Sequence, residues 1–346
     1  AGAIAELDVT GVGGVPDLGV TAVVMNVTVD TPYTAGFLTA YPGGEERPLV
    51  SNLNFVPGQT VPNLVTVKIG ANGKVNLFNS GASTNVIADV AGYYTSTAQP
   101  NGRFSALTPA RLLDTRDGTG RTGVAGPIGW GQTIDLGVTG VGGVPATGVS
   151  SVALNVTVDQ PTAKGFLTVY PTGEAKPNAS THNFVPGLTV ANMVIAKVGS
   201  SGKVSIYNFA GDTHVVADVV GYFSASGGLF VPIAPQRLVD SRQGAAMATM
   251  GQADANTMPI ATANPVPTAA KAVVVNVTSV NSSIPSFITV WPTGVAMPLA
   301  STLNPRPGVP VPNQAYLRVG TGGSLDAFNA SGTTDLIVDV FGYIIE

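Results

Sequence analysis

Two histidines, His182 and His214, and several recurring aspartates and asparagines are the residues of this chain best suited to chemistry. Histidine is a common general base and metal ligand, but a zinc site takes three or four ligands gathered in one place. The chain has no cysteine, and no nucleophile-elbow motif typical of a serine hydrolase accompanies the histidines. We therefore expect no metal site, no cofactor and no catalytic residues.

A short acidic segment is the other candidate for metal binding. Residues 114–118 read Asp-Thr-Arg-Asp-Gly and resemble part of a calcium-binding loop. A hard cation needs several carboxylate ligands, and the corresponding segment further along the chain has Gln243 in place of Asp117. The segment is therefore a poor basis for a calcium site.

The recurring polar residues reveal a tandem repeat with three copies. The triplet Asn-Val-Thr begins at Asn26, Asn155 and Asn276, and the pair Asp-Val begins at Asp89, Asp218 and Asp339. Both motifs shift by 129 residues from the first copy to the second (26 to 155, 89 to 218) and by 121 to the third (155 to 276, 218 to 339). Equal shifts at both ends indicate that each copy contains the same elements in the same order.

We predict that these recurring polar residues are structural, although they could also line three equivalent binding sites. An aspartate in an apolar strand needs a hydrogen-bond donor, because an unpaired buried group costs about 1–3 kcal/mol. Two arginine-rich segments supply candidate partners. The segments contribute Arg111, Asp114 and Arg116 in the second copy and Arg237, Asp240 and Arg242 in the third. Either arginine of each segment could pair with Asp218 or Asp339.

The elements that position these residues are predicted to be short strands. In residues 21–29, Val23, Met25, Val27 and Val29 alternate with Ala22, Val24, Asn26 and Thr28, which is the period of a β-strand. The first copy has further strand patterns at residues 6–10, 37–41, 51–55, 64–69, 75–78 and 85–90, separated by Gly, Pro and Asn. No segment has the helical period. This spacing predicts an all-β protein of three tandem β-sandwiches, Ig-like or jelly-roll in topology.

The expected domains are residues 1–95, 103–224 and 228–346. The segment Arg-Leu-x-Asp-x-Arg occurs at residues 111–116 and 237–242, so three sandwiches share two such strands. If the strand begins its domain, the first copy lacks it; if the strand ends the preceding domain, the third copy lacks it. The open edge could reflect truncation or processing upstream of Ala1, which we favour, or strand addition by another chain.

Composition excludes several classes of protein. Of the 346 residues, 44% are hydrophobic and only 10% are charged, and the net charge is −4 without a Lys/Arg block, so we expect no nucleic-acid partner. No apolar run reaches the ~20 residues that span a bilayer. The absence of cysteine and the start at Ala1 rather than Met suggest a processed, exported protein. We expect an extracellular or cell-surface location.

Aromatic pairs on one strand of each copy offer a candidate ligand surface. They are Phe37 and Tyr41, Phe166 and Tyr170, and Phe287 and Trp291. Flat aromatic side chains suit the faces of sugar rings when they are exposed to solvent. We favour the other interpretation, in which these residues fill the core between the two sheets of a sandwich.

Four motifs in order resemble a repeat of secreted actinobacterial proteins. They read Thr-Pro-Ala-Arg-Leu-Leu-Asp-Thr-Arg (108–116), Ala-Leu-Asn-Val-Thr-Val (153–158), Gly-Phe-Leu-Thr-Val-Tyr-Pro (165–171) and Ala-Asp-Val-Val-Gly-Tyr-Phe (217–223). In that family such units are joined to cell-wall hydrolases, peptidases or other exported proteins, or form arrays. The resemblance implies export and a surface role, without a ligand or catalytic residues. The third copy departs from the pattern at residues 304–307, Asn-Pro-Arg-Pro.

Two functional hypotheses follow. The first is a non-enzymatic extracellular structural protein whose repeats act as a spacer, an adhesin-like module or the subunit of a filament or coat, with copies of itself as partners. The alternative is a carbohydrate-binding module for cell-wall or extracellular polysaccharide. Solvent exposure of Tyr41, Tyr170 and Trp291 separates the two hypotheses most directly.

Overall fold

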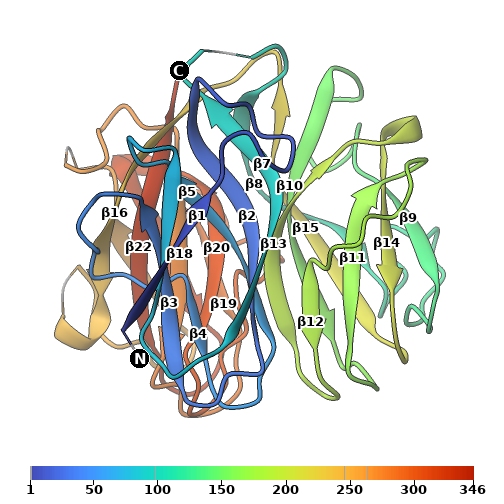
Figure 1. Cartoon of the computed structure of the whole chain (residues 1–346). Coiled ribbons are helices and arrows are strands. Elements are labelled where there is room, and N and C mark those ends of the chain that lie inside the picture. The colour runs from blue at the N-terminus through green and yellow to red at the C-terminus, as the bar shows by residue number, and fades with distance from the viewer. Residues whose placement is uncertain (1, 98, 245, 263) are drawn as a thin grey trace. The chain divides into compact units, whose positions relative to one another are not determined.

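Antiparallel strands make up almost all regular structure in the computed structural model, which describes residues 2–97, 99–244, 246–262 and 264–346 (Figure 1). Within these residues there is no α-helix, and the only helical turns are the 3₁₀ segments η1 (Ser200–Gly202), η2 (Ser241–Gln243) and η3 (Thr321–Gly323). The predicted all-β class is confirmed. Ala1, the expected processed end, lies outside the described residues.

The second copy shows the complete topology. Its strands are β8 (Arg103–Asp114), β9 (Thr133–Gly137), β10 (Val149–Asp159), β11 (Gly165–Pro171), β12 (His182–Phe184), β13 (Val190–Lys197), β14 (Lys203–Asn208) and β15 (His214–Ser224). They form two antiparallel sheets with the orders β13-β10-β15-β8 and β12-β11-β14-β9. Eight strands that cross between two four-stranded sheets in this order make a jelly roll, so the Ig-like alternative is wrong.

The first copy has the same order without its first strand. Its strands are β1 (Ala3–Asp8), β2 (Val20–Asp30), β3 (Gly36–Pro42), β4 (Leu53–Phe55), β5 (Val61–Lys68), β6 (Lys74–Asn79) and β7 (Asn85–Thr95). The sheets are β5-β2-β7 and β1-β6-β3-β4. Strand β1 begins three residues before the predicted segment 6–10.

The third copy keeps the first strand and loses one at the opposite edge. Its strands are β16 (Leu229–Asp240), β17 (Asp254–Pro259), β18 (Ala272–Val280), β19 (Ile288–Pro292), β20 (Val311–Arg318), β21 (Ser324–Asn329) and β22 (Asp335–Ile345), in sheets β16-β22-β18-β20 and β17-β21-β19. The counterpart of β4 and β12 is reduced to an isolated bridge between Ile288 and Leu303. Pro305 and Pro307 follow it and cannot donate the backbone hydrogen bonds that a strand needs.

Strand pairing settles which copy lacks the arginine-containing strand. β8 pairs with β15, and β16 pairs with β22, so each arginine-containing strand begins its own copy. In the first copy, β7 is the last strand of its sheet, and among the described residues no strand pairs with its outer edge. One of the two alternatives left open by the sequence is therefore shown: it is the first copy that lacks this strand.

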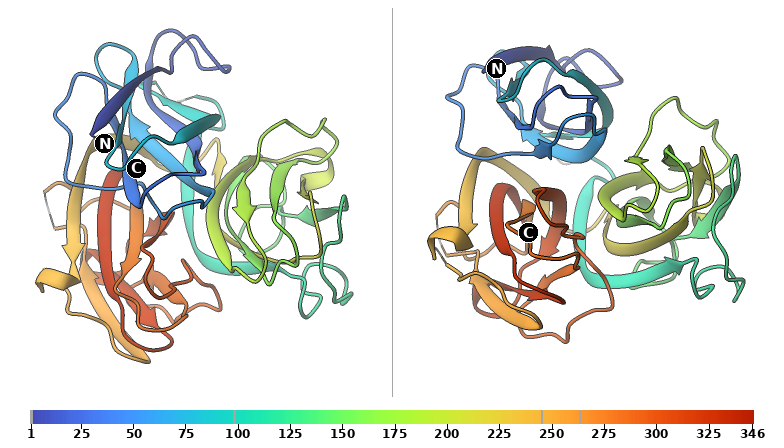
Figure 2. Two further views of the ribbon diagram at one scale, coloured as in Figure 1. Left: turned by 60° about the horizontal axis from the view of Figure 1, so that its bottom comes forward. Right: turned by 90° about the horizontal axis from the view of Figure 1, so that it is seen from below.

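Each copy has its own hydrophobic core between its two sheets. In β2 the core side consists of Val23, Met25, Val27 and Val29, the set that the alternation placed on one face. Burying each of these side chains contributes about 1.5–3 kcal/mol. Seen end-on, the strands of each copy curve around that copy's own centre (Figure 2).

The chain divides into two compact units: the first contains the first copy and most of the third, and the second contains mainly the second copy. In the first unit, β5 of the first copy contacts β16, β20 and β22 of the third (Figure 1). The other face of β2 is also buried, with Val24 and Thr28 nearly inaccessible to solvent. Both faces of β2 are therefore covered.

Candidate functional site

The recurring asparagines and aspartates lie side by side on neighbouring strands in every copy. The strand register places Asn26 opposite Asp89, Asn155 opposite Asp218, and Asn276 opposite Asp339. In the second and third copies the row continues onto the first strand, where Arg111 is opposite Asp218 and Arg237 is opposite Asp339. The structure thus brings together residues that the sequence singled out separately.

In the second and third copies, the arginine of the row binds its aspartate through two nitrogens. In the third copy, Nε and Nη2 of Arg237 donate to Oδ1 and Oδ2 of Asp339 at 2.8 and 3.2 Å, and Nη1 reaches Asp240 at 3.3 Å. Arg111 makes the same contacts with Asp218 and, at 2.9 Å, with Asp114. Bidentate arginine–carboxylate pairs combine charge with fixed geometry.

Burial dominates the ionisation of the two central aspartates. Desolvation raises the pKa of Asp218 to about 6, despite the hydrogen bonds and charge of Arg111. Burial likewise raises the pKa of Asp339, against the opposing effect of Arg237. A carboxylate that is fully removed from water depends on its arginine to remain charged at neutral pH.

The second arginine of each segment binds the neighbouring aspartate instead. Nη2 of Arg116 donates to Asp114 at 2.7 Å, and Nη2 of Arg242 donates to Asp240 at 2.6 Å. Burial disfavours the charge of Asp114, but the bonds from Arg116 outweigh it and lower the pKa. In the calcium-like segment, Arg116 thus occupies the Asp114 carboxylate, and the Asp117 carboxylate accepts a bond from the backbone N–H of Thr119. No cluster of three or more potential metal ligands occurs anywhere in the described residues.

The row of the first copy ends at Asp89. No arginine or lysine of the described chain forms an ion pair with this carboxylate, and partial burial alone raises its pKa. Asp89 therefore lacks the ion pair that its counterparts Asp218 and Asp339 form. The cause is the absent first strand, which carries the arginine in the other copies.

In the third copy, the paired Asn276 and Asp339 also form hydrogen bonds with a loop of the first copy. Nδ2 of Asn276 donates to the carbonyl oxygen of Ser51 at 2.8 Å, and the backbone N–H of Ser51 donates to Asp339. Asn276 Oδ1 in turn accepts a bond from Asn63 at 2.9 Å. The side chain of Asn63 also accepts a bond from the backbone N–H of Gln314 at 3.1 Å. These contacts join the first and third copies through buried polar groups.

Three hydroxyl groups extend this contact between the copies. Thr66 of the first copy lies 2.8 Å from the Tyr316 hydroxyl and donates to Gln314 at 2.9 Å. The Tyr94 hydroxyl donates to that of Tyr316 at 3.3 Å, and the Tyr94 ring packs on Phe230 with centroids 4.3 Å apart. Burial raises the pKa of Tyr316 to about 12 and that of Tyr94 well above its usual value.

Sequence reasoning missed the residues specific to this contact. Serine recurs at positions 51, 180 and 301, which is a signal that could have been used. Gln314 and Tyr316 differ from their second-copy counterparts Met193 and Ile195. Gln314 is the clearer signal, because it is a polar residue at a position where the other copies have Leu64 and Met193.

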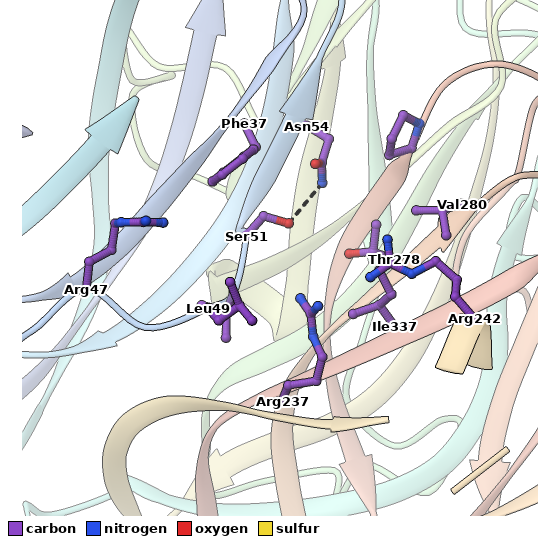
Figure 3. Close-up of a pocket in the computed structure, with 12 residues that line it drawn as sticks. Phe37, Arg47, Leu49, Ser51, Asn54, Arg237, Arg242, Thr278, Val280 and Ile337 are labelled. Carbon is purple, nitrogen blue, oxygen red and sulfur yellow. Dashed lines mark hydrogen bonds between the residues drawn. The ribbon is translucent and has the colours of Figure 1, made fainter. Parts of the chain in front are cut away.

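A cavity of about 230 Å³ lies beside this contact (Figure 3). Arg47 and Ser51 of the first copy and Arg237 and Arg242 of the third line it. Arg237 and Arg242 are already bound by aspartates, and the Arg47 guanidinium lies over the Phe78 ring, 4.1 Å from its centroid. The cationic groups of the cavity are thus engaged by the protein itself.

The candidate sugar-binding aromatics do not form an open platform. Tyr41 is 2% exposed and Trp291 is 6% exposed, while Phe37, Phe166 and Tyr170 are partly buried. Phe287 is the exception, at 40%. The core of the first copy contains Leu38 and Ala40 rather than Phe37 and Tyr41, so our expectation that the aromatics lie between the sheets is wrong. They occupy the opposite face of β3.

That face is covered because the segment after β3 folds back on it. Thr39 Oγ1 donates to the Val50 carbonyl at 2.6 Å, and the backbone N–H of Ala40 donates to Asn52 at 2.7 Å. In the third copy, Nε1 of Trp291 donates to the Val295 carbonyl at 3.1 Å. These rings pack within the protein.

The two histidines serve different local roles. Nε2 of His182 lies 2.8 Å from the Val156 carbonyl, and burial lowers its pKa to about 4, so the ring is neutral at pH 7. Nδ1 of His214 lies 3.1 Å from Oγ1 of Thr115, which also accepts a bond from the Val215 N–H. Thr115 is completely buried, so a substrate could not reach its hydroxyl.

Among the described residues, no helix has the length and hydropathy needed to cross a membrane.

Comparison with known proteins does not assign the chain to a family. No protein-family model and no curated protein matches the sequence. A solved structure described as the triple jelly-roll fold and turret assembly in an archaeal virus matches with 6% identity and a TM-score of 0.22, over 100% of this chain and 83% of that one. A structure of Sulfolobus turreted icosahedral virus matches with 7% identity and a TM-score of 0.21, over 100% and 84%. Similarity at this level carries no functional argument, and the jelly-roll assignment is based on the strand order.

Proposed function

We propose that this chain is a non-enzymatic structural protein of the cell surface or extracellular space, in which jelly-roll copies pack into a rigid scaffold. The observation that carries the proposal is the buried contact in which Asn276 and Asp339 bind the backbone of Ser51. Each copy has the asparagine, the aspartate and the serine at the corresponding positions. Each copy therefore carries both halves of the contact.

A contact between two different patches is heterologous, and repeating it builds rings or open arrays. Such a contact suits a spacer, a filament or a coat, and it uses the recurring polar residues without any reaction. The resemblance to repeats of secreted actinobacterial proteins supports the proposed location. Burial of Tyr41 and Trp291 speaks against the carbohydrate-binding alternative.

The rigid contact is tested by hydrogen–deuterium exchange of the full chain during denaturant unfolding. We expect β5 of the first copy and β20 of the third to lose protection together. Asn276→Asp places a second carboxylate beside Asp339 and should separate the two losses, whereas Asn72→Asp at an exposed turn should not. Independent loss in the unmodified chain would remove the basis of the proposal.

The functional alternatives are tested by binding and assembly. A panel of cell-wall and extracellular polysaccharides should show no saturable binding. A saturable signal that Tyr170→Ala abolishes would instead favour the carbohydrate-binding module. Light scattering with electron microscopy, from dilute protein to its solubility limit, separates the structural forms: growth in mass indicates a filament or coat subunit, and constant mass a spacer.

A further inference from the structure

The outer edge of β7 is open along the surface that β8 and β16 cover in the other copies. Val86 and Val90 are on the core-facing side of β7, yet they are 38% and 36% exposed. Their second-copy counterparts, Val215 and Val219, are completely buried. The core of the first copy is therefore accessible to solvent along this edge. Tyr94 of β7 takes part in the contact between the first and third copies, but the inference below does not depend on that contact.

A glycine in β7 leaves a space that an aromatic ring fills in the second and third copies. A Cβ atom at Gly221 would collide with the ring of Phe104 from β8, and one at Gly342 would collide with the ring of Phe230 from β16. At Gly92, the counterpart in the first copy, no atom lies within 4 Å of the same position. A glycine inside a strand commonly marks a close approach of another group. In the first copy that group is missing.

The turn before β2 preserves a second space of the same kind. In the second copy, the Cβ position of Gly142 is 2.6 Å from the side chain of Leu112, a residue of β8, and 2.9 Å from Val219. Its counterpart Gly13 has nearly the same φ, 59° against 58°. Gly13 is near Val90, the counterpart of Val219, but contacts no leucine. The turn at Gly13 therefore keeps its conformation although the leucine that contacts the equivalent turn is absent.

The negative charge of Asp89 at this edge also fits the absent strand, which carries an arginine in the other copies. Asp89 has no cationic partner among the described residues, while its counterparts bind Arg111 and Arg237. The strands that carry these arginines share an aromatic residue seven positions earlier, a leucine directly after the arginine, and an aspartate three positions after it. Three separate features of the first copy therefore correspond to three side chains of one sequence pattern.

We propose that the outer edge of β7 binds an extended strand with the pattern Phe-x6-Arg-Leu-x-Asp, carried by a polypeptide segment other than β8 and β16. By analogy with the register of β8 on β15, the arginine pairs with Asp89 and the phenylalanine packs on Gly92. The two strands of this pattern within the chain already complete their own sheets. If β8 or β16 paired with β7 instead, its own sheet would lose a strand and gain an open edge. Exchange of these strands between two chains would therefore add no net strand pairing.

The experiment uses a synthetic peptide of residues 103–116 and the full chain. We expect saturable binding of one peptide per chain, with new protection from hydrogen exchange confined to β7. Replacing the peptide residue Arg111→Ala, or the chain residue Asp89→Asn, should weaken binding by about thirtyfold or more, because either change breaks a buried charge pair. Asp8→Asn, at an exposed carboxylate of the same copy, should leave binding unchanged.

Gly92→Ala provides a variant that tests the shape of the site without disturbing the fold. The added methyl group meets nothing in the chain itself, so stability should be retained while peptide binding falls. Equal affinity of the peptide for this variant, or of a scrambled peptide for the unmodified chain, would show non-specific edge pairing and overturn the proposal.

A second experiment, in which the strand is fused to the chain, does not depend on the affinity of a free peptide. Residues 103–129 are joined directly before Ala1, which reproduces the spacing of the second copy and raises the effective concentration of the strand. We expect protection of β7 in this fusion and not in its Arg111→Ala version. Absence of protection with both the free and the fused strand would overturn the proposal. Dimers of the chain alone with a protected β7 would instead identify a second copy as the occupant.

Discussion

Arg237 and Asp339 form a two-pronged ion pair across β16 and β22, with Nε to Oδ1 at 2.8 Å and Nη2 to Oδ2 at 3.2 Å. The carboxylate is completely buried. The same pair recurs between Arg111 and Asp218. The arginine-containing strand is therefore fastened to its sheet by charge as well as by backbone pairing.

Removing the arginine should destabilise the third copy strongly. Arg237→Ala leaves Asp339 buried and uncompensated, which costs about 3–5 kcal/mol. Urea unfolding followed by exchange at β22 measures the loss. Adding Asp339→Asn should restore part of the stability. Asp89→Asn in the first copy is the matched control and should change stability by less than about 0.5 kcal/mol. Equal effects of Arg237→Ala and the control would contradict the assigned role of the pair.

His182 should make the second copy sensitive to acid. Its pKa is lowered to about 4 in the folded protein, against about 6.5 unfolded, so the unfolded chain binds more protons between these values. Stability is therefore lost as pH falls from about 7 to 4, by about 3 kcal/mol from this group.

The comparison for this prediction is His182→Leu, since Leu53 and Leu303 occupy the corresponding positions. The raised pKa of Asp218 acts in the opposite direction over part of the same range, but it is present in both proteins. The difference in unfolding free energy between them, measured at several pH values, isolates the histidine. A difference that does not vary with pH would refute the buried neutral ring.

Tyr316→Phe should weaken the contact between the first and third copies by about 1–2 kcal/mol, because Thr66 and Tyr94 lose a buried partner. Tyr343→Phe removes a hydroxyl group for which the described structure shows no hydrogen bond, and should have little effect. In the unmodified protein, the pKa of about 12 at Tyr316 means that stability falls as pH rises above about 10. Denaturant unfolding with exchange at β5 and β20 measures both effects.

Substitution by alanine should reduce stability at Gly221 but not at the equivalent Gly92. Gly221→Ala forces a methyl group against the Phe104 ring and the Ser105 carbonyl, and we expect a loss of about 1–3 kcal/mol. Gly92→Ala meets no atom, and we expect no loss. Thermal unfolding of the two variants tests this directly. Similar losses in both would mean that the space at Gly92 is not open.

The strands, and the division of the β2 side chains between two faces, could be predicted from the sequence because side chains alternate across a sheet with period two. The pairing of Asp218 with Arg111 rather than Arg116 could not, since both arginines lie in one short segment that is far from Asp218 in sequence. The position of Tyr41 was also mispredicted. Alternation identifies two faces, but it cannot tell which one borders the core when a folded-back segment buries the other as well.

Hydrogen–deuterium exchange of the three equivalent strands β7, β15 and β22 tests the account most directly. An incomplete first copy predicts fast exchange at the N–H groups on the outer edge of β7, with slow exchange at the corresponding groups of β15 and β22, which pair with β8 and β16. Equal protection of all three strands in the chain alone would contradict the open edge and the proposal based on it.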